Sequence, residues 1–285
     1  MLTRRNFVAT TLAAVAGGAI GRKAIVPFTG TLSDRAKKLD RIGIQLYSVR
    51  DLMAKDFEGT LASLAQIGYK EVEFAGFYNR KPADIRALLQ KDGLVAPSAH
   101  LGFDVLAKNT DQTFADVADL GAQFATVAWT PQEERGGADK WKAIADKFNA
   151  AGRIAKTHGL SFAYHNHDFE FDPAAGPVHP LDILVQNTDP ALVNFEMDVY
   201  WVTHAGQKPV EYLTKYPNRF AMLHLKDGGA PPDYAMTDVG SGTIDFASIL
   251  RAASMVQHVF VEKDLQNDPM GFARNSYAYL NNLNF

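Results

Sequence analysis

Short apolar runs alternate with amphipathic segments from Arg41 onward, and the pattern repeats about every thirty residues, the length of one strand-helix unit. The segment after the first run places Phe57, Leu61 and Leu64 on one helical face and stops at Gly68. Eight such units without a change in composition favour a closed barrel over an open sheet. The eight predicted strands lie at residues 41–47, 71–76, 94–100, 123–129, 160–167, 193–201, 220–227 and 258–264.

We therefore predict an α/β fold with a single (β/α)8 TIM barrel over residues 41–285, preceded by a linker at 25–40. No G-x-G-x-x-G motif follows the first strand, and no G-x-x-x-x-G-K-[ST] motif occurs, so the sequence does not indicate a dinucleotide-binding or P-loop fold. Residues 227–245, which are rich in glycine and proline, are predicted to form a long loop after the seventh strand. Long loops on that face often cover active sites.

Residues 1–24 have the pattern of an export signal peptide. Arg4 and Arg5 precede an uncharged run from Asn6 to Gly21 that is short for a membrane span. The arginine pair is similar to the twin-arginine signal, a route that exports folded proteins. We expect a periplasmic or otherwise exported protein with no stable membrane insertion after leader removal. A mitochondrial-type presequence or a chance basic terminus is the alternative.

The residue counts limit the possible chemistry. The chain has no cysteine, which excludes disulfides, thiolate metal sites and a cysteine nucleophile, so any metal must be bound by nitrogen and oxygen. Acidic residues number 32 and basic residues 29, and four of the basic ones lie in the predicted leader. A nucleic-acid partner is therefore not expected, because phosphate binding needs a concentrated basic surface.

Polar side chains gather at the ends of the last four predicted strands. These ends meet at the mouth of a TIM barrel, and residues two apart on a strand share a face. Such a cluster is costly to bury unless it binds something, and one divalent metal ion (Mn, Co, Zn or Fe) is the simplest partner. Each residue alone also fits a structural role as a hydrogen-bonded histidine or a helix-capping aspartate. In chain order the residues are His165, His167, Asp198, His224, Lys226 and Glu262.

Six stretches resemble the xylose isomerase-like TIM barrels, a family that includes sugar phosphate isomerases/epimerases, ketose 3-epimerases and inosose dehydratases. They are IGIQLYSVR, YHNHDFEF, FEMDVYW, HLKD, GSGTIDF and VEKD, and the resemblance covers essentially all of residues 41–285. Metal sites of this family use one ligand from each of strands five to eight, usually in the order Glu, Asp, His, Glu. The resemblance implies that the metal ligands here are His165, Asp198, His224 and Glu262.

The first implied ligand departs from the family pattern, because His165 stands where the epimerases have glutamate. The resemblance implies that epimerases place metal-bound carboxylates on opposite faces of the sugar to remove and return a proton. Here Glu262 is left as the strong candidate base, since a metal-bound His165 cannot easily serve as one. His167, with a pKa expected near the working pH, and Lys226 are the other predicted catalytic residues. Glu196 is expected to support the metal shell.

Five further residues are predicted to bind the substrate. Trp129 and Trp201 offer apolar faces for a sugar ring, with core packing as the alternative role for either. Trp201 also stands where the resemblance places a substrate-binding histidine. Gln45, Glu73 and His100 end the first three predicted strands, with service as helix caps or supporting partners as the alternative for Glu73 and His100.

The sequence thus predicts a metal-dependent sugar isomerase or epimerase that abstracts a proton next to a carbonyl and forms a metal-stabilised enediolate. Two alternatives stay open. One is a lyase or hydratase that acts by β-elimination on 3-keto-glycosides or inosose-like keto-sugars, because elimination needs one base and one acid. The other is a non-catalytic sugar-binding protein. The expected partner is a small sugar or keto-sugar, and a homo-oligomer is compatible with the sequence.

Overall fold

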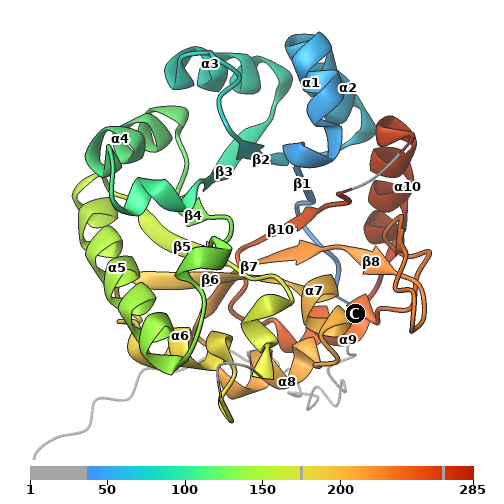
Figure 1. The fold of residues 1–285 in the computed structure, drawn as a ribbon. Coiled ribbons are helices and arrows are strands. Elements are labelled where there is room, and N and C mark those ends of the chain that lie inside the picture. The colour runs from blue at the N-terminus through green and yellow to red at the C-terminus, as the bar shows by residue number, and fades with distance from the viewer. Residues whose placement is uncertain (1–36, 174–175, 265–266) are drawn as a thin grey trace, which may run out of the picture. The chain divides into compact units, whose positions relative to one another are not determined.

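The computed structural model describes residues 37–173, 176–264 and 267–285. Eight parallel strands close into a barrel, and helices surround it (Figure 1). Strands that follow one another along the chain are neighbours in the sheet, and β10 closes the barrel against β1. The predicted TIM barrel is confirmed. The barrel strands are β1 (Gly43–Gln45), β2 (Glu71–Ala75), β3 (Val95–Leu101), β4 (Phe124–Val127), β5 (Ser161–His165), β6 (Val193–Asp198), β7 (Phe220–Leu225) and β10 (His258–Val261).

The helices begin and end at residues whose chemistry favours those positions. Asp56 caps the second α-helix by accepting a hydrogen bond from the Gly59 N–H, and the third ends at Gly93, whose φ of 71° suits glycine. The α-helices are α1 (Arg50–Lys55), α2 (Phe57–Ile67), α3 (Pro82–Asp92), α4 (Thr110–Leu120), α5 (Ala138–Thr157), α6 (Pro180–Asn187), α7 (Val199–His204), α8 (Pro209–Lys215), α9 (Phe246–Ala252) and α10 (Pro269–Asn282). Short 3-10 helices are η1 (Leu46–Val49), η2 (Phe103–Leu106), η3 (Gln132–Glu134) and η4 (Phe169–Phe171).

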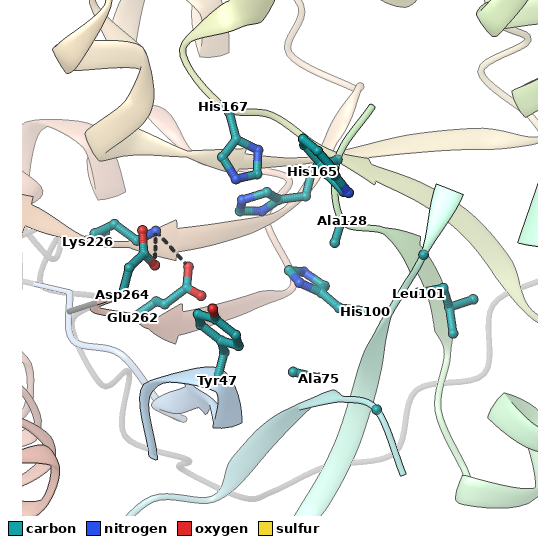
Figure 2. Close-up of a pocket in the computed structure, with 13 residues that line it drawn as sticks. Tyr47, Ala75, His100, Leu101, Ala128, His165, His167, Lys226, Glu262 and Asp264 are labelled. Carbon is teal, nitrogen blue, oxygen red and sulfur yellow. Dashed lines mark hydrogen bonds and ion pairs between the residues drawn. The ribbon is translucent and has the colours of Figure 1, made fainter. Parts of the chain in front are cut away.

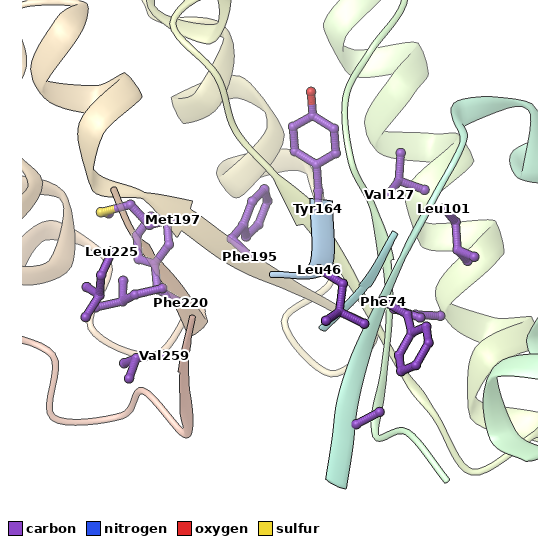
Figure 3. Packing of buried hydrophobic residues seen from close by; sticks show 14 of the residues in the cluster. Leu46, Phe74, Leu101, Val127, Tyr164, Phe195, Met197, Phe220, Leu225 and Val259 are labelled. Atoms are coloured by element: carbon purple, nitrogen blue, oxygen red, sulfur yellow. The ribbon is translucent and has the colours of Figure 1, made fainter. Parts of the chain in front are cut away.

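The side chains of each strand alternate between the barrel interior and the helices outside. On β5 the outward Phe162 and Tyr164 are fully buried and pack against Phe148 of α5, with ring centroids 5.3 Å and 4.8 Å away. Figure 3 shows part of this outer core. A separate apolar cluster occupies the barrel interior, and it closes the base on which the polar residues of the mouth rest. Its members are Phe124, Ala163, Ala221, Met222 and Phe260.

The segment 227–245, predicted as a long loop, contains a short antiparallel pair, β8 (Asp227–Gly228) and β9 (Met236–Thr237). The carboxylate of Asp227 holds it together. Its oxygens accept backbone N–H groups from Gly228, Gly240, Gly242 and Ile244 at 2.8 to 3.3 Å. One buried carboxylate therefore fixes the conformation of the loop that follows β7.

The predicted signal peptide, residues 1–24, and most of the predicted linker, residues 25–40, lie outside the described residues. In the part of the chain that the structure describes, no helix combines the length and the apolar character that crossing a membrane requires.

Candidate metal centre and catalytic cavity

Four side chains from neighbouring strands meet inside the mouth of the barrel, and we call them the donor group. His165 and Asp198 end β5 and β6, His224 lies near the end of β7, and Glu262 directly follows β10. Each offers one nitrogen or oxygen atom, and these atoms lie within 4.8 Å of one another. All four residues are buried, and the pairing of β6 with β7 sets Asp198 opposite His224.

Two deeper carboxylates orient the imidazoles of the donor group. Nδ1 of His165 lies 3.0 Å from Oε2 of Glu196, and Nε2 of His224 lies 2.6 Å from Oε2 of Glu73. The other ring nitrogens face the donor group: Nε2 of His165 is 3.8 Å from Oδ2 of Asp198, and Nδ1 of His224 is 2.8 Å from a Glu262 oxygen. Histidines that bind metals usually have such a carboxylate behind them, because it fixes the tautomer and the direction of the ring.

Three further side chains complete this deeper layer. Nε2 of His100 lies 2.7 Å from Oε2 of Glu196 and 3.1 Å from Oε2 of Glu73. The amide of Gln45 donates to Oε2 of Glu73 at 2.7 Å, and the hydroxyl of Ser98 donates to Oε1 at 2.5 Å. Gln45 and Glu73 have no exposed surface, so they lie beneath the mouth and hold the imidazoles in place.

A second combination of donors shares His165 and His224 but replaces the carboxylates of the donor group with Glu196 and His100. In this combination one oxygen of Glu196 already contacts all three imidazoles at 2.7 to 3.2 Å. In the second combination, Oε1 of Glu196 is buried without a hydrogen-bond partner among the described residues, and in the donor group the same is true of Oδ2 of Asp198. Buried carboxylate oxygens are rarely left so, and a bound cation would satisfy this one.

The charges of the donor group also fit a cation. Burial raises the pKa of Asp198 to about 6, against the opposing effect of Lys226 and His224. Burial, reinforced by the charge of His224, lowers the pKa of His165 to about 3, so that this ring is neutral and able to ligate. For His224, the negative charges of three surrounding carboxylates outweigh burial and raise the pKa well above its ordinary value. A cation that binds here must therefore displace a proton from His224.

Lys226 is an ammonium surrounded by carboxylates. Its Nζ lies 2.9 Å from Oε2 of Glu262 and 2.9 Å from Oδ1 of Asp264, and both contacts are drawn in Figure 2. It also lies 3.1 Å from Oδ2 of Asp198, without hydrogen-bond geometry. Burial alone would lower the pKa of Lys226, but the three carboxylates outweigh burial and raise it. The side chain is therefore cationic at neutral pH.

A cavity of about 620 Å³ opens over these residues, a volume typical of small-molecule sites. His100, His165, His167, Lys226, Glu262 and Asp264 border it, and Figure 2 shows the imidazoles and carboxylates around a common space. Two aromatic side chains at its wall, Tyr47 and Trp129, are 43% and 45% exposed. Small residues on the side of β2, β3 and β4 leave room between these rings, namely Ala75, Gly76, Gly102 and Ala128.

His167 borders the cavity, but its environment differs from the one we predicted. Burial lowers its pKa well below the ordinary value, and the proximity of His165 and of the Lys226 ammonium adds to this effect. The prediction of a pKa near the working pH is therefore wrong. Its Nδ1 is buried without a hydrogen-bond partner among the described residues, and its backbone N–H donates to Glu170 at 2.8 Å. Trp201 packs beside it, with ring centroids 5.6 Å apart.

A family model described as a xylose isomerase-like TIM barrel matches residues 61–257, more than half of the chain. The chain belongs to the xylose isomerase-like TIM barrel family. The chain is similar to an inosose dehydratase from Geobacillus kaustophilus, with 28% identity over an alignment of 189 residues that covers 59% of this chain and 60% of that protein. The chain thus matches less than two thirds of the length of this curated relative.

Solved structures of other proteins share the barrel. A sugar phosphate isomerase/epimerase from Parabacteroides distasonis superposes with a TM-score of 0.74 at 27% identity, covering 84% of this chain and 96% of that one. The IolI protein with a bound zinc atom superposes with a TM-score of 0.67 at 14% identity, covering 84% and 97% of the two chains. The second likeness, at this low identity, shows the fold alone.

In this member of the family, the structure brings all four implied ligands together. Of the five residues predicted to bind substrate, His100 and Trp129 border the cavity, whereas Gln45, Glu73 and Trp201 do not. Sequence reasoning missed Tyr47 and Asp264. Asp264 carried a signal, because it follows Glu262 by two positions and therefore shares its face. Tyr47 carried a signal of the same kind, because it ends the first predicted strand two positions after Gln45, although in the structure it belongs to η1.

Proposed function

We propose that this chain is a metal-dependent lyase that removes water or an alcohol from a keto-sugar or inosose by β-elimination. One observation carries the proposal: Glu262 is the one carboxylate of the donor group that borders the cavity, while Asp198 lies wholly beneath it. Epimerisation by two opposed carboxylates needs a second base at the position of His165. There the ring has one nitrogen on Glu196 and the other near Asp198, so it offers no free base.

The donor set fits a divalent metal ion, because two imidazoles and two carboxylates with an unsatisfied buried oxygen are suited to Mn²⁺, Co²⁺, Zn²⁺ or Fe²⁺. His165, Asp198, His224 and Glu262 would hold it. When bound, such an ion would polarise a carbonyl of the substrate and so acidify the C–H bond of the neighbouring carbon. That the curated relatives include inosose dehydratases supports the same class of reaction.

The residues of the chain supply the base and the acid. Burial alone would raise the pKa of Glu262, but Lys226 and His224 hold it well below the usual range, so the carboxylate is ionised. Glu262 takes a proton from the carbon next to the carbonyl, the electron pair forms a carbon–carbon double bond, and the bond to the oxygen on the next carbon breaks. The leaving oxygen takes its proton from an N–H donor on the cavity wall, for which Lys226 and His100 are the candidates.

Solvent exchange and product analysis test the proposal. Metal-loaded protein in deuterated water, given a panel of inososes and 3-keto-glycosides, should release water or alcohol and form an unsaturated ketone. Exchange of deuterium with inverted configuration and no loss of oxygen would instead identify an epimerase, the second candidate, which the similarity to a sugar phosphate isomerase/epimerase favours. Binding without exchange across the panel would identify a sugar-binding protein.

Two matched variants locate the base. Glu262→Gln should depress turnover strongly while leaving the fold intact. Glu71→Gln is the control, because Glu71 is also a buried carboxylate inside the barrel and pairs with a histidine, His258, at 2.9 Å at the opposite end. If Glu262→Gln and Glu71→Gln both convert substrate at the rate of the parent protein, Glu262 is not the base.

Export through the predicted twin-arginine leader is part of the proposal. It agrees with a substrate that carries no phosphate, because sugar phosphates are scarce outside the cytoplasm. Replacing Arg4 and Arg5 with lysine should keep the protein in the cytoplasm of an expression host that has this route. Unchanged export of the double variant would contradict it.

A further inference from the structure

Lys226 binds the same carboxylates that would hold a metal ion. Its Nζ lies 3.1 Å from Oδ2 of Asp198 and 2.9 Å from Oε2 of Glu262, two members of the donor group. The third carboxylate in contact, Asp264 at 2.9 Å, is not a member of that group. The Lys226 side chain is 2% exposed, so water screens these contacts little.

An ammonium and a divalent cation cannot both be held closely by these two carboxylates without strong repulsion. Like charges a few ångströms apart in a buried site repel strongly, even at an effective dielectric constant of about 20. Asp198 and Glu262 each present one oxygen to Lys226, and for Asp198 it is the oxygen that has no hydrogen bond. Binding of the metal ion must therefore weaken or break at least part of the contact with Lys226.

Asp264 can bind the ammonium of Lys226 when the metal ion displaces it from Asp198 and Glu262. Its carboxylate borders the cavity, its side chain is 26% exposed, and it already accepts a hydrogen bond from Nζ. Because Nζ already lies 2.9 Å from Asp264, a shift of the ammonium toward this carboxylate would weaken its contacts with the donor group. After this shift Lys226 still borders the cavity as an N–H donor.

We propose that Lys226 competes with the metal ion for Asp198 and Glu262, and that Asp264 sets the metal affinity by holding the lysine when the ion is bound. The inference rests on the proposed metal site but not on the proposed reaction. It assigns Asp264 as a positioning residue that acts through Lys226. A purely structural role for the lysine leads to a different expectation, because loss of a structural ion pair would disorder the donor group and weaken metal binding.

Titration of the metal-free full-length protein with Mn²⁺ at neutral pH, followed by calorimetry without substrate, tests this. Lys226→Met should bind Mn²⁺ on the order of tenfold more tightly than the parent protein, because a competing buried charge is removed. Asp264→Asn should bind it on the order of tenfold more weakly, because the ammonium stays on the donor group. Lys263→Met is the control, since Lys263 is the adjacent lysine and pairs with Asp238 at 2.9 Å, away from the donor group.

The two variants have opposite signs, and each can overturn the inference. Equal or weaker binding by Lys226→Met contradicts the competition. If that variant does not fold, Asp264→Asn still decides, because unchanged or tighter binding by it contradicts the role of Asp264. Failure of the parent protein itself to bind Mn²⁺, Co²⁺, Zn²⁺ or Fe²⁺ would instead overturn the proposed metal site and with it the proposed function.

Discussion

The protein should lose stability as the pH rises through neutrality, because of Glu170. Replacing Glu170 with glutamine should abolish this loss. Glu170 lies in η4 and has no exposed surface. One carboxylate oxygen accepts the backbone N–H of His167 at 2.8 Å, and the other accepts the hydroxyl of Tyr164. Burial raises the pKa of Glu170 from the ordinary 4.5 to about 7, although both hydrogen bonds oppose the shift. The folded protein therefore favours the protonated acid.

The direction and size of the effect follow from this difference. A group whose pKa is raised by folding contributes its full stabilisation below its unfolded pKa, here 4.5, and loses it as the pH rises through the folded pKa of about 7. The interval between the two values corresponds to about 3 kcal/mol of unfolding free energy. Glutamine keeps a carbonyl for His167 and cannot ionise, so the variant should keep this free energy at high pH.

Urea unfolding at about pH 5 and about pH 8, followed by circular dichroism, measures the difference. Between the two pH values the stability of the Glu170→Gln variant should rise relative to that of the parent protein by about 2 to 3 kcal/mol. Glu211→Gln is the control, because Glu211 is an exposed glutamate in a surface pair with Lys208, and such a pair contributes little to stability. An equal pH dependence of the parent protein and Glu170→Gln would refute the reasoning.

Three changes test the metal centre itself. Asp198→Ala should remove most of the bound metal with the barrel retained, which metal analysis and circular dichroism measure together; full occupancy would remove Asp198 from the ligand set. Glu196→Gln should weaken metal binding by roughly 10- to 100-fold by freeing the ring of His165, and an unchanged affinity would contradict its supporting role. His165→Glu should increase deuterium exchange with inverted configuration relative to elimination, because it restores a second carboxylate. A variant that only loses activity would show that the histidine serves chemistry a carboxylate cannot replace.

The barrel could be predicted from the sequence because its signal is repeated. Each strand is short, but eight apolar runs at a regular spacing leave few other folds that can bury them all. Glycines that follow predicted helices, such as Gly68 and Gly93, add local evidence for where these helices end. The leader is different, since its residues lie outside those the structure describes and its prediction stays untested.

The sequence could predict which strand face a residue lies on, but not how deep along the barrel axis it lies. Gln45, Glu73 and His100 each end or nearly end a strand, and the pattern treats them alike. The strands are staggered, so that His100 reaches the cavity while Gln45 and Glu73 stay beneath it. The prediction of the His167 pKa was wrong for a related reason. Its burial and the neighbouring ammonium are properties of the packed structure and not of the local sequence pattern.

Under the proposed function, the deeper layer explains how a histidine at position 165 fits a metal site but not a second base. Glu196 fixes one nitrogen of His165, and burial keeps the ring neutral, so in the proposed site the other nitrogen would serve as a ligand and not as a base. A glutamate at this position would add a negative charge next to Glu196 and Asp198, in a site that already holds the carboxylate of Glu262. With His165 the donor group carries one negative charge fewer. A histidine at this position does not affect a reaction that needs only one base, whereas a two-base epimerase would lack its second base.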